Sequence, residues 1–293
     1  MLRRLASVLA LAAAGAVLVA GVSRLDWSRV GRGGFVVGCA WSHSSQDDAI
    51  VHPNDPGASH SHDFFGNTST NARSTRGSLL AAGTTCRNDD DTAAVWSPSP
   101  YLNGIGVTPL RERTYYFGAG RPTVRSLPAG LKMLAGDMMA SSPDDNPRAS
   151  WFCGGGTPVA DHPYDCTPYR GDGGAIDGIT GMVDFPQCWD GVHLDSPDHT
   201  SHLAYRPGPS CPSDHPVLLP RLRVRIHRGV WDPCAGLRPC SPTDAPADNI
   251  RLSLASGPYW TLHADYWNTW HQDALDDLVT TCLRTGKACH DAM

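Results

Sequence analysis

Histidine and aspartate gather in four short stretches of the chain, and these side chains are the ones that could do chemistry. In the first stretch, residues 59–67, His60 and His62 are separated by one residue. Side chains alternate between the two faces of a strand, so both imidazoles are predicted to project from the same face. Such a pair can bind a metal ion or present an acid and a base, although the same spacing also suits a hydrogen-bonded structural role.

Two further stretches follow a Cys-Trp-Asp-Gly run. Residues 188–205 are dense in titratable groups, and residues 211–216 add His215. Loops rich in Pro, Ser and Gly and held by a disulfide are common places for functional sites. Aspartate and serine also form turns and cap backbone segments, so part of this density is expected to be structural. The titratable residues of the longer stretch are Asp190, His193, Asp195, Asp198, His199, His202 and Tyr205.

The fourth stretch, residues 262–270, is predicted to be a strand that leads into a helix. This geometry places His263 and Asp265 on one face. The aromatic rings of Tyr266 and Trp267 suit stacking on sugar rings, and equally suit burial in a core.

The candidate site residues form three sets. The candidate catalytic residues are His60, His62, Asp190, Asp195, His199, His202, His215 and Asp265. The candidate substrate-binding residues are Trp189, Tyr205, Tyr266 and Trp267. A divalent metal is the candidate cofactor, and its candidate ligands are His60, His62 and His202.

The elements that must position these residues are mostly short strands. Residues 35–39, 115–117, 131–135, 218–226 and 250–254 have the composition or the alternation of strands. One helix is predicted over residues 269–283, with Asn268 as its cap and Gly286 as its stop. Many turns and one closing helix predict a mainly β fold, a loop-rich β-sandwich or jelly-roll-like domain stapled by disulfides.

The N-terminus and the cysteines indicate export. Arg3 and Arg4 precede an apolar stretch over residues 5–22, so residues 1–30 are predicted to be a signal peptide or an N-terminal membrane anchor. Residues 31–293 are predicted to be a single extracellular domain, either secreted or tethered by that segment. All 10 cysteines follow the segment and there is no C-x-x-C pair, which favours five disulfides. Bridges between 153 and 166, 234 and 240, and 282 and 289 are plausible because short loops close easily.

The motifs in order resemble one family. The runs H-x-H-x-F-F-G-N, C-W-D-G, L-D-S-P-D-H-x-S-H-x-A-Y, C-P-x-x-H-P-V-x-L-P and H-A-D-Y-W-N-x-W are similar to those of the secreted family of unknown function DUF1996. The resemblance covers about residues 39–282. Fungal members sometimes carry a carbohydrate-binding WSC module, which implies an extracellular polysaccharide context. The family has no established activity, so the resemblance implies no catalytic role for any residue.

Three functions are consistent with these observations. The first is a carbohydrate-active enzyme, a glycoside hydrolase or polysaccharide lyase, that acts on cell-wall or extracellular polysaccharide through histidines and aspartates. The second is a metal-dependent hydrolase with a histidine-rich centre. The third is a non-catalytic wall-binding or structural module in which these side chains form a hydrogen-bonded network.

Several other classes are disfavoured. The lone glutamate, Glu112, lies outside the motifs and H-E-x-x-H is absent, which argues against a zincin. No G-x-S-x-G elbow is present, which argues against a serine hydrolase. A net charge of −5 implies no nucleic-acid partner, and membrane contact is expected only through the N-terminal segment.

Overall fold

A computed structural model describes residues 33–118, 120–155, 157–170, 177–234, 236, 240–243, 250–287 and 289. The predicted targeting segment, residues 1–30, lies outside these residues. Within the described part, none of the helices has the length and apolar character needed to cross a membrane. The fold is mainly β, with 32% strand and 11% helix, as the sequence predicted.

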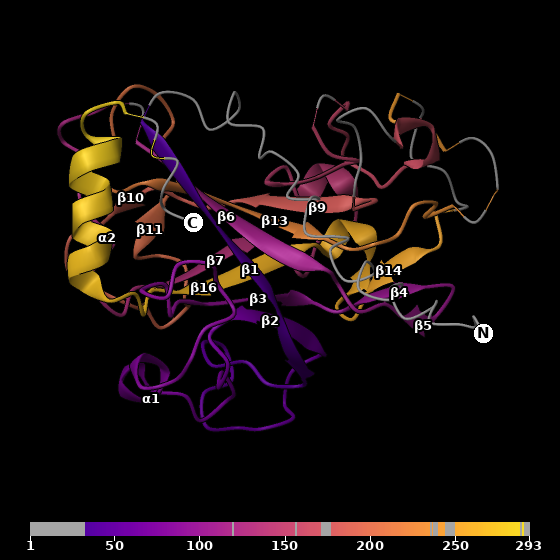
Figure 1. Ribbon diagram of the computed structural model, residues 1–293, viewed down its shortest axis with the longest axis horizontal. Helices are drawn as coiled ribbons and strands as arrows, with labels where there is room; N and C mark the ends of the chain where they lie inside the picture. The colour runs from indigo at the N-terminus through magenta and orange to yellow at the C-terminus, as the bar shows by residue number, and fades with distance from the viewer. Residues whose placement is uncertain are drawn as a thin grey trace, which may run out of the picture.

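A nine-stranded antiparallel sheet forms the body of the molecule and curls until it is nearly closed (Figure 1). Its strand order is β7-β16-β3-β2-β1-β6-β13-β9-β8, and β7 comes close to β9. The strands are β1 (Gly34–Ser45), β2 (His62–Gly66), β3 (Ala94–Pro98), β6 (Arg111–Phe117), β7 (Lys132–Gly136), β8 (Ala149–Phe152), β9 (Thr180–Asp184), β13 (Arg221–His227) and β16 (His263–Trp267).

Smaller elements surround this sheet. A three-stranded sheet contains β10 (Cys188–Trp189), β11 (Leu203–Ala204) and β12 (Val217–Leu218). A four-stranded sheet contains β4 (Pro100–Leu102), β5 (Ile105–Gly106), β14 (Leu252–Leu254) and β15 (Gly257–Pro258). The helices are α1 (Arg76–Leu80) and α2 (Gln272–Leu278), with a π-helical turn at Val279–Leu283 and 3-10 turns at Pro143–Asp145, Thr167–Tyr169 and Tyr259–Thr261. In Figure 1, α2 stands at one end of the sheet, and the chain around α1 lies beside β2.

The two faces of the sheet bury different cores. On the inner face, Ala264 and Tyr266 of β16 belong to the large core of the molecule. Alternation along the strand places His263, Asp265 and Trp267 on the outer face. Over β2, β3 and β16 this outer face is covered by the loop of residues 46–61 and by α1. The residues of this second, smaller core are Ala49, Ile50, Phe64, Leu79, Ala94, Trp96 and Trp267.

The predicted strands are found with one interruption, except that His60 precedes β2, which begins at His62. The segment 218–226 divides into β12 and β13 at Leu219 and Pro220, where proline has no N–H to continue a ladder. The predicted helix start is wrong. Helix α2 begins at Gln272 with His271 as its cap, because the Asn268 amide instead donates to the carbonyl oxygens of Leu127 and Pro128. Gly286 follows the helical segment with a φ of 76°, consistent with its predicted role as a stop.

Five disulfides staple the domain. The three predicted local bridges, 153–166, 234–240 and 282–289, are confirmed. The remaining two are Cys39–Cys86, which ties β1 to the segment before β3, and Cys188–Cys211, which ties the start of β10 to the loop before β12. Five disulfides are consistent with an extracellular protein, since such bridges persist in oxidising compartments.

Candidate metal centre

Five side chains converge between the outer face of the sheet and the loop that covers it. The ligand atoms of His60, His62 and His263 all lie within 4.8 Å of one another, and so do those of Asp48, His62 and Asp265. We call these five residues the histidine–aspartate centre. Four of them are buried, with at most 8% of the residue surface exposed, and His60 is half-buried.

Backbone carbonyls fix the tautomers of two of the imidazoles. The Nδ1 atom of His62 lies 3.0 Å from the carbonyl oxygen of Asp47, and that of His263 lies 2.9 Å from the carbonyl oxygen of Thr261. A carbonyl only accepts, so each Nδ1 carries the proton and each Nε2 keeps its lone pair. A metal-binding histidine typically has its second nitrogen tied in this way. The Nε2 atoms of His60 and His62 and the Oδ2 atom of Asp265 are buried without a hydrogen-bond partner among the described residues.

Burial sets the charge of the centre. It lowers the pKa of His62 to about 3 and that of His263 to about 3, and the neighbouring imidazoles act in the same direction. Both rings are therefore neutral near pH 7, the state in which imidazole binds metal. Burial also raises the pKa of Asp265 well above its usual value, with Asp48 adding to the effect. Asp48 is held by its Oδ1 atom, which accepts from the backbone N–H groups of Ile50 and Val51, each at 2.8 Å.

The position of His263 depends on a close approach between β7 and β16. Gly136, opposite His263 in the β7–β16 pair, has a φ of +85°. A Cβ atom there would lie 2.4 Å from the carbonyl oxygen of Leu262 and 2.7 Å from the Cα atom of His263. Only glycine combines this backbone conformation with that contact at no steric cost.

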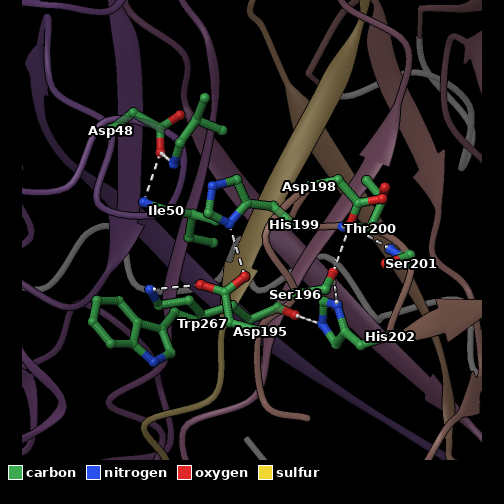
Figure 2. A network of polar contacts seen from close by, with 12 residues as sticks. Asp48, Ile50, Asp195, Ser196, Asp198, His199, Thr200, Ser201, His202 and Trp267 are labelled. Atoms are coloured by element: carbon green, nitrogen blue, oxygen red, sulfur yellow. Dashed lines mark hydrogen bonds and ion pairs between the residues drawn. The ribbon is translucent and has the colours of Figure 1, made fainter.

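The second motif stretch folds into its own hydrogen-bonded network, which Figure 2 draws together with Asp48 and its bond to Ile50. Asp195 accepts from Lys132 at 3.0 Å and lies 2.8 Å from Nδ1 of His199. Both ring nitrogens of His202 are engaged, Nδ1 by the Ser196 hydroxyl and Nε2 by the carbonyl oxygen of Lys132. His202 is therefore not a member of the centre. The third imidazole of the centre is His263, whereas His202 was the third histidine ligand proposed from the sequence.

Other candidate residues of that region also form hydrogen bonds that hold the loops in place. Asp190 is 2.6 Å from Nδ1 of His193, and its Oδ1 atom accepts two backbone N–H groups. Nε2 of His215 lies 2.9 Å from the carbonyl oxygen of Ser201. Of the eight candidate catalytic residues, only His60, His62 and Asp265 belong to the centre, and Asp195 and His199 form a separate pair.

The four candidate substrate-binding aromatics are largely engaged with the protein. Tyr266 is completely buried, with its hydroxyl 3.1 Å from that of Tyr116, and Trp267 is 7% exposed under the Lys132 ammonium. Neither has a free ring face for a sugar. Tyr205 donates to the carbonyl oxygen of Asp184 and lies under the guanidinium of Arg148. Trp189 donates to the carbonyl oxygen of His193.

One member of the centre, Asp48, and one surface aromatic, Trp41, were missed from the sequence. His263 was placed on one face with Asp265 but was not included among the candidate catalytic or metal-binding residues. Asp48 precedes a short apolar run in a loop, and nothing in the neighbouring sequence indicates that it belongs to a site. Trp41 of β1 is 36% exposed and lines a hollow on the surface.

A polar trough adjoins the centre. It consists of two hollows of about 500 and 530 Å³ that share Asp47, Ser69 and Asn71. Serine, threonine and asparagine side chains dominate the lining, and Trp41 supplies an aromatic ring. Asp47 connects the trough to the centre, since it lines both hollows and its carbonyl oxygen accepts from His62.

No curated protein and no solved structure matches this chain. A family model matches residues 48–270, a span that includes all five members of the centre. The chain belongs to the family described as domain of unknown function (DUF1996).

Proposed function

We propose that this protein is a divalent-metal-dependent hydrolase that acts outside the cell on polysaccharide. The observation that carries the proposal is the convergence of three imidazoles and two carboxylates, of which His60, His62 and Asp265 each have a buried polar atom without a partner among the described residues. Buried polar atoms without partners are costly, so an arrangement with several at one point favours a bound cation. A set rich in imidazole suits Zn²⁺ or another first-row transition metal better than Mg²⁺ or Ca²⁺.

The exposure of the centre indicates where chemistry would occur. His60 is its only member that is not buried, so water and substrate would approach from the side of this residue. A bound divalent cation polarises water and supplies a nucleophile at neutral pH. The protein's own contribution is to keep His62 and His263 neutral by burying them and to orient both rings through their hydrogen bonds to backbone carbonyls.

The trough supports a polysaccharide as the substrate. Its hydroxyl and amide lining matches the hydrogen-bonding groups of sugars, and the exposed ring of Trp41 offers a stacking surface. Its two connected hollows suit an extended chain better than a compact ligand.

A second candidate is a non-catalytic wall-binding module with a structural ion. The observation that favours it is the burial of Asp48, His62, His263 and Asp265, because closed sites without an open position are typical of structural metals. The two candidates differ in one respect: the structural ion would stabilise the fold without supporting turnover.

The experiment that separates them starts from protein purified without a histidine tag. Metal content is measured before and after chelation, and a polysaccharide panel is assayed for new reducing ends and for unsaturated products. We expect about one divalent ion per chain, and reducing ends that disappear on chelation and return with Zn²⁺ or Mn²⁺. His60→Ala should abolish turnover with little loss of thermal stability, because this residue is half-buried.

His193→Ala is the matched control, since its side chain is 63% exposed and lies outside the centre. Metal binding without turnover on any substrate would favour the structural module. Full turnover in metal-free protein would overturn the proposal, and unsaturated products would replace hydrolysis by elimination.

A further inference from the structure

A third hollow, of about 310 Å³, lies on the outer face of β1 and β6. It arises from the pairing of small residues with arginines: Gly38 is opposite Arg113, and Ala40 is opposite Arg111. With almost no side chain on β1, the space beside the two arginines stays open. Arg87 also lines this arginine hollow.

The arginine hollow is positively charged, because three arginines line it and Asp177 pairs with one of them. Among the described residues, no carboxylate lines it. Arg111 forms an ion pair with Asp177, whereas the described residues give Arg87 and Arg113 no ion pair. The Nε atom of Arg111 is buried and has no hydrogen-bond partner in the described part of the chain. A buried donor without a partner is the group that an anionic ligand satisfies.

The arginine hollow continues the trough. Thr85 lines both the arginine hollow and the hollow of Trp41, and Ala40 and Trp41 are consecutive residues of β1. The arginine hollow therefore adjoins the hollow of Trp41, which in turn shares Asp47, Ser69 and Asn71 with the other hollow of the trough.

We propose that the arginine hollow is an anion subsite of the trough, which binds an acidic group on a sugar of the polysaccharide. This inference rests on the proposed function, because it takes the trough to hold a glycan. A guanidinium matches the planar geometry of a carboxylate, so the uronate carboxylate is the expected group. A sulfate ester presents related chemistry and is the other source that the experiment must distinguish.

The test measures binding and not turnover, with two pairs of polymers that differ only in charge. Polygalacturonate is compared with its methyl ester, and dextran sulfate with dextran. Affinity is measured by calorimetry in metal-loaded full-length protein at low and at moderate salt. We expect polygalacturonate to bind at least tenfold more tightly than its methyl ester, with a preference that weakens as salt rises.

Two variants probe the hollow itself. Arg87→Gln removes an exposed guanidinium without disturbing the core, and should lower the affinity for polygalacturonate about five- to tenfold. Gly38→Val fills the space between the strands, and a Cβ atom there meets nothing closer than 3.7 Å, so the strand tolerates it. It should abolish the preference for the charged polymer. Arg251→Gln removes an exposed arginine outside the trough and is the matched control.

Each outcome decides the proposal. Preference for the charged polymers that is lost in Arg87→Gln and Gly38→Val, but kept in Arg251→Gln, supports it, and the stronger of the two pairs identifies carboxylate or sulfate. Equal affinity within each pair, equal losses in all three variants, or no binding to any polymer overturns it. Turnover of a neutral polysaccharide in the panel assay, with no charge preference in the binding measurement, would leave the proposed function standing and remove the subsite. A charge preference in binding, with no turnover in the panel assay, would keep the subsite and remove the proposed function.

Discussion

Replacing Asp91 with asparagine should make the protein more stable, by an amount that grows with pH. Asp91 is 3% exposed, and burial raises the pKa of its carboxyl from an ordinary value near 3.8 to about 8. One of its oxygens accepts the backbone N–H of Ala93 at 3.0 Å, which offsets only part of this effect. At pH 7 the folded protein therefore keeps this carboxyl protonated, whereas the unfolded chain ionises it.

The direction of the pH dependence follows from the number of protons that the folded and unfolded states bind. Between about pH 4 and pH 8 the native state binds one proton more than the unfolded state at this residue, so stability falls as pH rises. The slope is about 1.4 kcal/mol per pH unit, which amounts to about 4 kcal/mol at pH 7. The contribution of Asp91 to stability is fully present below the pKa of this carboxyl in the unfolded chain. It is lost as pH rises through the pKa of the same carboxyl in the folded protein. Asparagine keeps the acceptor oxygen for Ala93 and has no proton to exchange.

Urea unfolding at pH 5, 6 and 7, followed by tryptophan fluorescence with the disulfides intact, measures the effect. We expect the stability difference between Asp91→Asn and the wild-type protein to grow by about 3 kcal/mol from pH 5 to pH 7. Asp89→Asn, which removes an exposed carboxylate nearby, controls for the change in net charge. Parallel stability curves for Asp91→Asn and the wild type would refute the argument, because the carboxyl would then ionise equally in both states.

Three further predictions concern the site. Zn²⁺ at a hundredfold excess over its Kd should raise the unfolding free energy by about 3 kcal/mol, and His263→Gln should remove most of this gain; an undiminished gain in a calorimetric scan would exclude His263 as a ligand. His202→Ala should cost about 1–3 kcal/mol of stability in urea while the Zn²⁺ Kd, measured by titration, stays unchanged, because both ring nitrogens serve Ser196 and a backbone carbonyl. Gly136→Ala should cost about 1–3 kcal/mol or more, since it combines a left-handed backbone with a contact to Leu262; an unchanged melting temperature would contradict this.

Alternation along the chain predicted the strands within residues 218–226 and 250–254, because one face of each is buried and that constraint is visible locally. Strands β3, β8 and β9 of the main sheet were not predicted. The helix start was missed because Asn268 had a choice of partners. An asparagine can cap a helix or satisfy distant carbonyls, and only the folded chain brings Leu127 within reach.

The site was harder to predict, for the same reason. The dense stretch 188–205 contains residue types that serve catalysis and turns alike, and here Asp195, His199 and His202 hold loops together. Asp48 became visible only once the loop of residues 46–61 was placed over the sheet. The aromatic residues of β16 were ambiguous because a core and a sugar platform require the same side chains, and Tyr266 turned out to be buried.

The order in which the chain can assemble follows from the positions of the centre's five side chains. Asp48 and His60 lie on a loop near the beginning of the described chain, and His263 and Asp265 lie on a strand near its end. In the sheet, β16 reaches β2 only through β3. A cation cannot be held jointly by the loop and by His263 or Asp265 until β16 has paired, so metal uptake at the proposed site would report that this pairing is in place, and a refolding time course followed by a metal-sensitive dye would record it.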